Sequence, residues 1–250
     1  MIKFVRHIRQ CIIMENSKST RYLKYAIGEI ILVVIGILIA LQINNWNENR
    51  KKKNEIQRSL IALKEDLHKD ITHINEQLPE VQYQYTLNES LRQRLATKGA
   101  NTDTLLKITR TEFNPNWTEP IIYNTNSYNS LLESGLMEEL EDSLKNEIKD
   151  FYNQKYFKLN LVTSVTQDYR VKLRDYVDHY TFGSTALHDQ GPFIDSLVWS
   201  NVNFKHLAAA FQGLSNFKRI LFNLTRDEME FSQKNSELLI NQINEFLEKT

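Results

Sequence analysis

The chain has 250 residues, enough for one sizeable domain or two small ones, and its 31 basic residues balance its 31 acidic ones. Seven glycines and four prolines argue against a turn-rich β fold and a glycine-rich phosphate loop, and a single cysteine, Cys11, excludes an internal disulfide and a cysteine metal cluster. The net charge is +5 over residues 1–25, +2 over residues 26–53 and −7 over the remainder. This asymmetry argues against nucleic acid as the main partner and favours anionic lipid near the basic end.

The first segment, residues 1–21, is basic and is predicted to form an amphipathic helix in the plane of a membrane interface. Its apolar and polar residues fall on opposite helical faces. The apolar face carries Met1, Phe4, Val5, Ile8, Cys11 and Ile12, and the polar face carries Lys3, Arg6, Arg9 and Gln10.

Residues 22–46 contain an almost uninterrupted apolar run, which predicts a transmembrane helix. Ala26 to Ile43 is 18 residues, about 27 Å of helix, which just spans a hydrocarbon core of about 30 Å. Aromatic and basic residues suited to the membrane interface flank the run: Tyr22, Trp46, Arg50, Lys51, Lys52 and Lys53. A cleaved signal peptide fits less well, because no small-x-small cleavage site follows the run. A buried helix of a soluble core is the remaining alternative.

One carboxylate, Glu29, interrupts this run near its start. On a helix with 100° per residue, Glu29 shares a line with Gly36 and Ala40. Gly36 and Ala40 have the small-xxx-small spacing that lets two membrane helices approach closely. One hypothesis is therefore that Glu29, Gly36 and Ala40 form a self-association seam. The other is that Glu29, only one turn inside the run, reaches the headgroups.

The membrane orientation is weakly specified, because six Lys or Arg residues precede the span and five follow it closely. A short basic segment before a single span usually stays in the cytoplasm. We therefore expect the basic segment to stay in the cytoplasm and the body, residues 47–250, to lie in the periplasm or outside the cell.

The body begins with a long amphipathic helix that is expected to continue directly from the span. Its apolar positions alternate in steps of four and three, as in a coiled coil. They are Ile56, Leu60, Leu63, Leu67, Ile71, Ile74, Leu78, Val81 and Tyr85. Pro79 should kink this helix, and the turn residues of 97–104 should end it or its return arm.

The rest of the body is predicted to be helical as well. A loop over 112–120 precedes a short helix that starts near Tyr123 and stops at Gly135, and a second long helix starts near Ser143. Residues 181–193 break that helix, and Asn203 can cap the next one. Gly213 is expected to interrupt the helix that starts at Phe204 and to separate it from a last long helix. The fold class is therefore all-α: a transmembrane helix followed by an elongated antiparallel bundle with coiled-coil-like long helices.

Residues with known chemistry are sparse and isolated. Glu65 and His68 have the i, i+3 spacing of a bundle metal site, but the second such pair that a site needs is missing from the sequence. We interpret this pair as a solvated face, and we predict neither a cofactor nor a catalytic residue. The basic stretch before the heptads superficially resembles a DNA-binding zipper, but the adjacent span makes a headgroup anchor the better interpretation.

Aromatic residues gather near the two predicted loops. Phe113, Trp117, Tyr123 and Tyr128 lie around the first, and Phe182, Phe193 and Trp199 around the second. In an antiparallel bundle these loops could meet at one end. They would form either a closed aromatic cap, which we favour, or a pocket in which polar groups converge near Trp117, Asp189 and Trp199.

Four stretches of the sequence resemble the bacterial family of domains of unknown function numbered 6090. They are MIKFVRHIRQ, YAIGEIILVVIGILIALQINNWNENRKK, YNSLLESGLMEEL and LKNEIKDFYN. The resemblance is close over residues 1–53 and looser over the body. It implies a single-span membrane protein of the Bacteroidota type with a helical body, and it implies no known activity, cofactor or catalytic residue.

These features favour a non-enzymatic, membrane-anchored scaffold, sensor-like or assembly module. Its expected partners are the lipid bilayer, a second copy of the chain through the span, and a protein that the sequence does not identify. The alternative is a ligand-binding receptor or enzyme with a pocket at the loop-rich end of the bundle.

Overall fold

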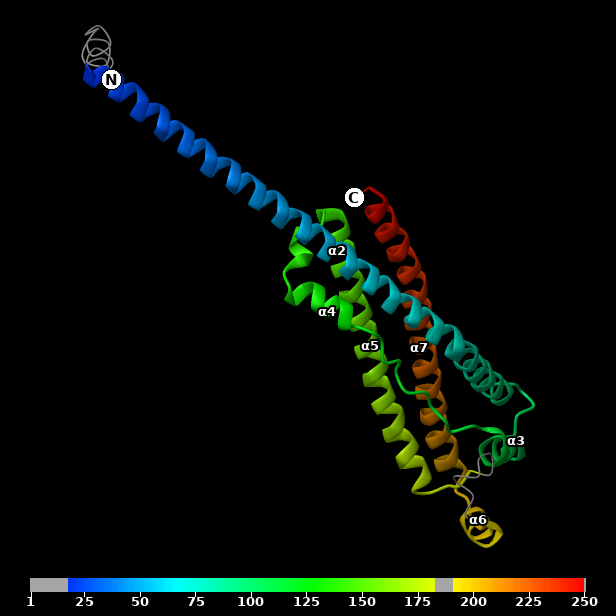
Figure 1. Ribbon diagram of the computed structural model, residues 1–250. Helices are drawn as coiled ribbons and strands as arrows, with labels where there is room; N and C mark the ends of the chain where they lie inside the picture. The colour runs from blue at the N-terminus through cyan, green and yellow to red at the C-terminus, as the bar shows by residue number, and fades with distance from the viewer. Residues whose placement is uncertain (1–17, 183–190, 250) are drawn as a thin grey trace, which may run out of the picture. The chain divides into compact units, whose positions relative to one another are not determined.

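The computed structural model describes residues 18–182 and 191–249, and Figure 1 shows the order of its elements. These are α2 (Lys18–Leu95), α3 (Thr102–Lys107), η1 (Ile108–Glu112), α4 (Asn126–Glu133), η2 (Leu136–Glu139), α5 (Asp142–Val177), α6 (Gly191–Ser200) and α7 (Phe204–Lys249). The described residues contain no strand, which confirms the all-α fold class. Of the predicted segment 1–21, residues 1–17 lie outside the described residues.

The chain divides into two compact units, Met1–Gln57 and Arg58–Thr250. In the first unit every side chain from Tyr22 to Trp46 is exposed. Helix α2 is the one described helix that is long and apolar enough to cross a membrane, by length and composition, and none of its apolar window is buried. The domain boundaries at residues 21 and 46 remain a prediction.

Helix α2 is continuous, so the predicted passage from the apolar run into the amphipathic helix without a helix break is confirmed. It also continues across the exposed Pro79. In the second unit the predicted apolar positions face the core: Leu60, Leu63, Leu67, Ile74 and Val81 are at most 1% exposed. The spacing of four and three therefore identified the buried face of this helix.

The second unit is built around three long helical pieces and one extended stretch. Helices α5 and α7 pack against each other along their length and run in opposite directions (Figure 1). The body part of α2 joins them through buried Ile74, Val81 and Leu91. Between α3 and α4 the chain returns along the bundle as the irregular segment 113–125. The alternating directions of an up-and-down bundle are thus kept, with an extended segment in place of one helix.

The helix ends follow local rules. The side-chain oxygen of Asn203 accepts hydrogen bonds from the N–H groups of Lys205 and His206, so it caps α7 as predicted. Gly135 has φ +74°, a left-handed conformation that suits glycine, and it separates α4 from η2.

The prediction that Gly213 interrupts the helix is wrong, because α7 continues without a break across Gly213. A glycine inside a helix costs about 1 kcal/mol relative to alanine. Apolar residues on both sides of Gly213 are buried, among them Leu207, Phe211, Leu214 and Leu221. Each such side chain contributes about 1.5–3 kcal/mol, so burial outweighs the local preference.

Candidate functional site

The described residues place their buried charged side chains around the extended segment 113–125, which we call the strap. An extended chain outside a sheet cannot pair its backbone N–H and C=O groups within itself, and buried backbone groups need partners. In this body, side chains of α2, α5 and α7 supply those partners.

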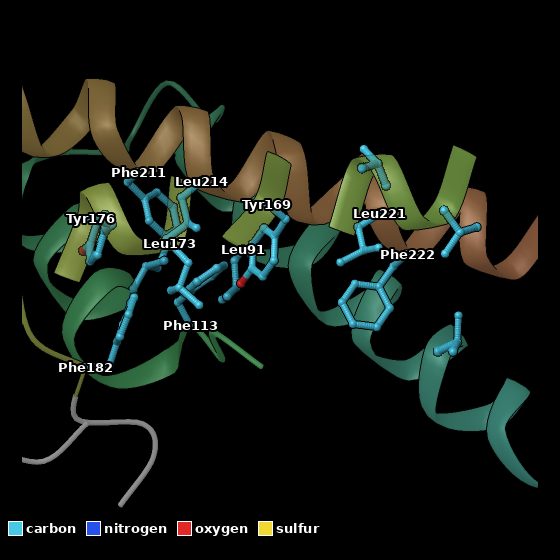
Figure 2. Close-up of a cluster of buried hydrophobic side chains, with 14 of the residues drawn as sticks. Leu91, Phe113, Tyr169, Leu173, Tyr176, Phe182, Phe211, Leu214, Leu221 and Phe222 are labelled. Carbon is cyan, nitrogen blue, oxygen red and sulfur yellow. The ribbon is translucent and has the colours of Figure 1, made fainter. Parts of the chain in front are cut away.

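The first end of the strap is anchored by aromatic packing and two backbone acceptors. Phe113 is 1% exposed, and its ring centre lies 5.9 Å from that of Phe182 and 5.0 Å from that of Phe211. Figure 2 shows these rings in one cluster with Tyr169. The Tyr169 hydroxyl donates to the Pro115 carbonyl at 2.6 Å, and the Lys218 ammonium donates to the Asn114 carbonyl.

The other end of the strap is anchored by an ion pair. Lys155 of α5 and Asp70 of α2 are each 1% exposed in their side chains, with Nζ and Oδ2 2.8 Å apart. The second Asp70 oxygen accepts from the backbone N–H of Asn124 at 2.9 Å and from its side-chain amide at 2.8 Å. The Lys155 ammonium also lies 3.7 Å from the centre of the Tyr123 ring.

A second carboxylate completes this anchor. The Tyr123 hydroxyl donates to both oxygens of Glu228 on α7, at 2.9 and 3.0 Å, and Ser232 donates to the same carboxylate at 2.7 Å. One turn before Asp70 on α2, Asp66 accepts from the Ser127 N–H at 3.2 Å. Because Thr125 makes no side-chain cap for α4, Asp66 caps that helix from another element.

Burial sets the protonation behaviour of these groups. It lowers the pKa of Lys155, although the Asp70 carboxylate acts in the opposite direction. Burial raises the pKa of Glu228, against the hydrogen bonds from Ser232 and Tyr123. It lowers the pKa of Lys218 to about 7. The hydrogen-bond acceptors of Lys218 are neutral: the Gln84 side-chain oxygen at 3.1 Å and the Asn114 carbonyl.

The anchor residues therefore have a structural assignment. Lys155 and Asp70 pair with each other, Asp70, Glu228 and Lys218 bond to the strap, and Asp66 bonds to α4; all five are buried. Removal of one partner of a buried pair costs about 3–5 kcal/mol, because the other charge is left without compensation. The function that follows from this geometry is to fix the strap in register along the bundle.

The sequence did not identify these anchors, although a signal was present. Asp66 and Asp70 occupy positions of the apolar stripe of α2, next to Leu63, Leu67 and Ile74. A charged residue on an otherwise apolar helix face is buried only when it is paired.

The aromatic residues of the two predicted loops meet only in part. Phe113 reaches Phe182, but Tyr128 stacks on Tyr152 with ring centres 3.8 Å apart, beside the other end of the strap. Trp117 lies between the anchors, 5.4 Å from the Arg170 guanidinium. Phe113, Tyr123 and Phe182 share one hydrophobic cluster, against which Trp117 and Trp199 pack. Tyr128 lies apart from this cluster, because the first loop extends along the bundle.

Polar groups near Trp199 pair with one another. Its indole N–H donates to Thr181 at 2.9 Å, Thr181 donates to Asp195 at 3.0 Å, and Asp195 pairs with Arg110. Asp189 lies outside the described residues. Glu65 and His68 are both exposed, and no group of three or more His, Cys, Asp or Glu in the described part of the chain could hold a metal ion.

The predicted membrane-helix seam and the predicted membrane-interface residues belong to the first unit. Glu29, Gly36 and Ala40 are exposed, and a Cβ atom added to Gly36 would meet nothing within 4 Å. Tyr22, Trp46, Arg50, Lys51, Lys52 and Lys53 are exposed too. The Arg50 guanidinium lies 5.2 Å from the centre of the Trp46 ring. The roles of the seam and of the anchors remain predictions.

The fold defines the class of protein: an all-α bundle protein with one helix long and apolar enough to cross a membrane. A family sequence model matches residues 29–179, more than half of the chain, so the chain belongs to the family of unknown function DUF6090. The match covers the strap, with Asp70 and Lys155, and ends before α6 and α7. No curated protein and no solved structure matches the chain.

Substitution of Lys218 should change how stability depends on pH. The pKa of Lys218 is about 7 in the folded chain and 10.5 without burial. Between these values the unfolded chain binds more protons, so the free energy of unfolding rises with pH, by about 1 kcal/mol per pH unit. Lys218→Met removes this contribution. From pH 7 to pH 9 the free energy of unfolding should therefore rise more steeply for the wild type than for the variant.

The measurement is urea unfolding of the full chain in detergent micelles, followed by circular dichroism at several pH values. Lys205→Met, on an exposed position of α7, is the matched control and should leave the slope of the wild type unchanged. Equal slopes for Lys218→Met and wild type would contradict the lowering of the Lys218 pKa by burial.

Proposed function

We propose that the protein is a single-span membrane protein whose helical body acts as a non-enzymatic scaffold, sensor-like or assembly module. The observation that carries the proposal is the exposure of every side chain from Tyr22 to Trp46 on α2. A core helix of a soluble protein would bury its apolar face, and the apolar window of α2 is 0% buried. A contiguous apolar surface of this length calls for lipid or a partner.

The transfer energies favour lipid. Residues 26–43 include 12 Ile, Leu and Val residues. Each contributes about −0.3 to −0.6 kcal/mol on an insertion scale, or about −4 to −7 kcal/mol together. A carboxylate costs about 2.5–3.5 kcal/mol at the bilayer centre and less near an end, where Glu29 lies. Insertion is therefore favourable in spite of the Glu29 carboxylate.

The interpretation as a scaffold rests on the second unit. Lys155 and Asp70 bond to each other, and Asp70, Glu228 and Lys218 bond to residues of the strap and hold this extended segment in place. This supports a body that presents a fixed surface. We place the body in the periplasm and the basic segment in the cytoplasm, across a bacterial inner membrane, because a short basic segment before a single span usually stays in the cytoplasm.

Cysteine accessibility tests the anchoring and the orientation together. The chain has one native cysteine, Cys11, on one side of the span. A Cys11→Ser, Lys98→Cys variant moves the thiol to an exposed turn of the body. In intact cells a membrane-impermeant maleimide should label the variant and leave the wild type unlabelled, and both should react after lysis. Labelling of Cys11 alone would reverse the orientation, and equal labelling of both in spheroplasts would reject a span.

We further propose that two copies of the chain associate through Glu29, Gly36 and Ala40. Gly36→Leu places a branched side chain where a second helix would approach, so self-association of residues 22–50 in a membrane reporter assay should fall several-fold. Gly28→Leu makes the same change on another side of the helix and should have little effect. Unchanged association in Gly36→Leu would reject the seam and leave Glu29 as a headgroup contact.

A further inference from the structure

A groove of about 570 Å³ lies at the end of the body where α2 stops. Three elements form it: the last turns of α2, helix α3 with the turn before it, and the first turns of α7. All of its lining residues belong to the second unit. Its volume falls within the range of about 300–1,000 Å³ that is typical of small-molecule sites.

The walls of the groove are mainly apolar. Leu95, Leu105, Phe204 and Ala208 line it, and Phe211 forms part of its floor. Phe211 is 2% exposed and packs edge-on against Phe113 of the strap at 5.0 Å. The floor is therefore continuous with the core, which Figure 2 shows around Phe211 and Leu214. Such a surface accepts an apolar chain without rearrangement of the bundle.

Arg92 is the one charged residue among the described residues that line the groove. Its Nε lies 3.2 Å from a Glu89 oxygen, and its Nη1 donates to the Ser215 hydroxyl at 3.4 Å. The same Glu89 oxygen also faces Arg219 at 3.9 Å. Arg92 thus shares the Glu89 carboxylate with Arg219, which lies outside the groove lining, and it is the one cation that the described lining offers to an anionic ligand.

We propose that this groove binds a single-chain amphiphile with a carboxylate head, of the fatty-acid type. The apolar walls would cover the acyl chain, and the guanidinium of Arg92 would bind the carboxylate. A guanidinium suits this head because its N–H donors match the two oxygens of a carboxylate. The inference is independent of the membrane anchor proposed above, since the groove lies entirely in the second unit.

Photocrosslinking tests this assignment on the full chain in lipid nanodiscs. The probe is a sixteen-carbon fatty acid with a diazirine in its chain, compared with the alcohol of the same chain. We expect the acid to label peptides of α2 and α7 that line the groove. Arg92→Gln should lower the apparent affinity for the acid by about tenfold and leave that for the alcohol unchanged. Lys98→Gln, which removes a positive charge from a residue outside the groove lining, should have no such effect.

Two adjacent alanines provide a matched pair for the groove itself. Ala208 lines the groove and Ala209 does not, although both are exposed. Ala208→Phe should abolish labelling of the groove peptides by both probes, and Ala209→Phe should leave it intact. Equal labelling of these two variants, labelling confined to residues 26–43, or no preference for the acid would overturn the proposal. A protein helix in the groove would appear as protein crosslinks without lipid labelling, which would also overturn it.

Discussion

An extended segment inside a helical bundle is possible only if other elements satisfy its backbone. The strap, residues 113–125, is not part of a sheet in the described structure, and side chains from three helices bond to its backbone at Asn114, Pro115 and Asn124. Lys218 and Tyr169 bind its first carbonyl groups, and Asp70 binds Asn124 near its end. The rest of the body follows from this arrangement. The strap returns the chain along the bundle, so that α5 runs in the same direction as α2.

The two units of the chain satisfy their backbone hydrogen-bonding groups in different ways. In a bilayer a helix satisfies its own backbone, so a single apolar helix can cross without help from other segments. The described part of the first unit is such a helix, and its exposed side chains from Tyr22 to Trp46 support the proposal of a membrane span. In the second unit the extended segment needs buried charges, and each charge needs a partner. In our proposal the first unit is a helix that satisfies its own backbone in lipid. In the second unit, side chains of neighbouring helices bond to the backbone of the strap.

Periodic features of this chain were predictable from sequence, and pairwise ones were not. The buried face of α2, the cap at Asn203 and the stop at Gly135 depend on residues close in sequence, so local patterns revealed them. The pair of Asp70 and Lys155 joins residues 85 positions apart, and the bond from Lys218 to Asn114 spans 104. No local pattern specifies such a contact. At Gly213 the local pattern predicted a helix break that does not occur, because buried apolar residues on both sides stabilise a continuous helix.

The match to the family model ends within the second unit of the chain. It covers Asp70, Lys155 and the whole strap but ends at residue 179, before Lys218 and Glu228 on α7. The ion pair that holds the second end of the strap thus lies within the matched region. Both residues of that pair belong to helices that also carry much of the apolar core, so the strap and the core form one structural unit.

The free energy of unfolding of Asp70→Ala tests most directly whether buried charge holds the strap. The substitution leaves Lys155 buried without its carboxylate and the Asn124 N–H without its acceptor, so urea unfolding of the full chain in micelles should show a loss of about 3–5 kcal/mol. Glu65→Ala, at an exposed position of the same helix, should change stability by less than about 0.5 kcal/mol. Similar small losses for the two variants would contradict the account.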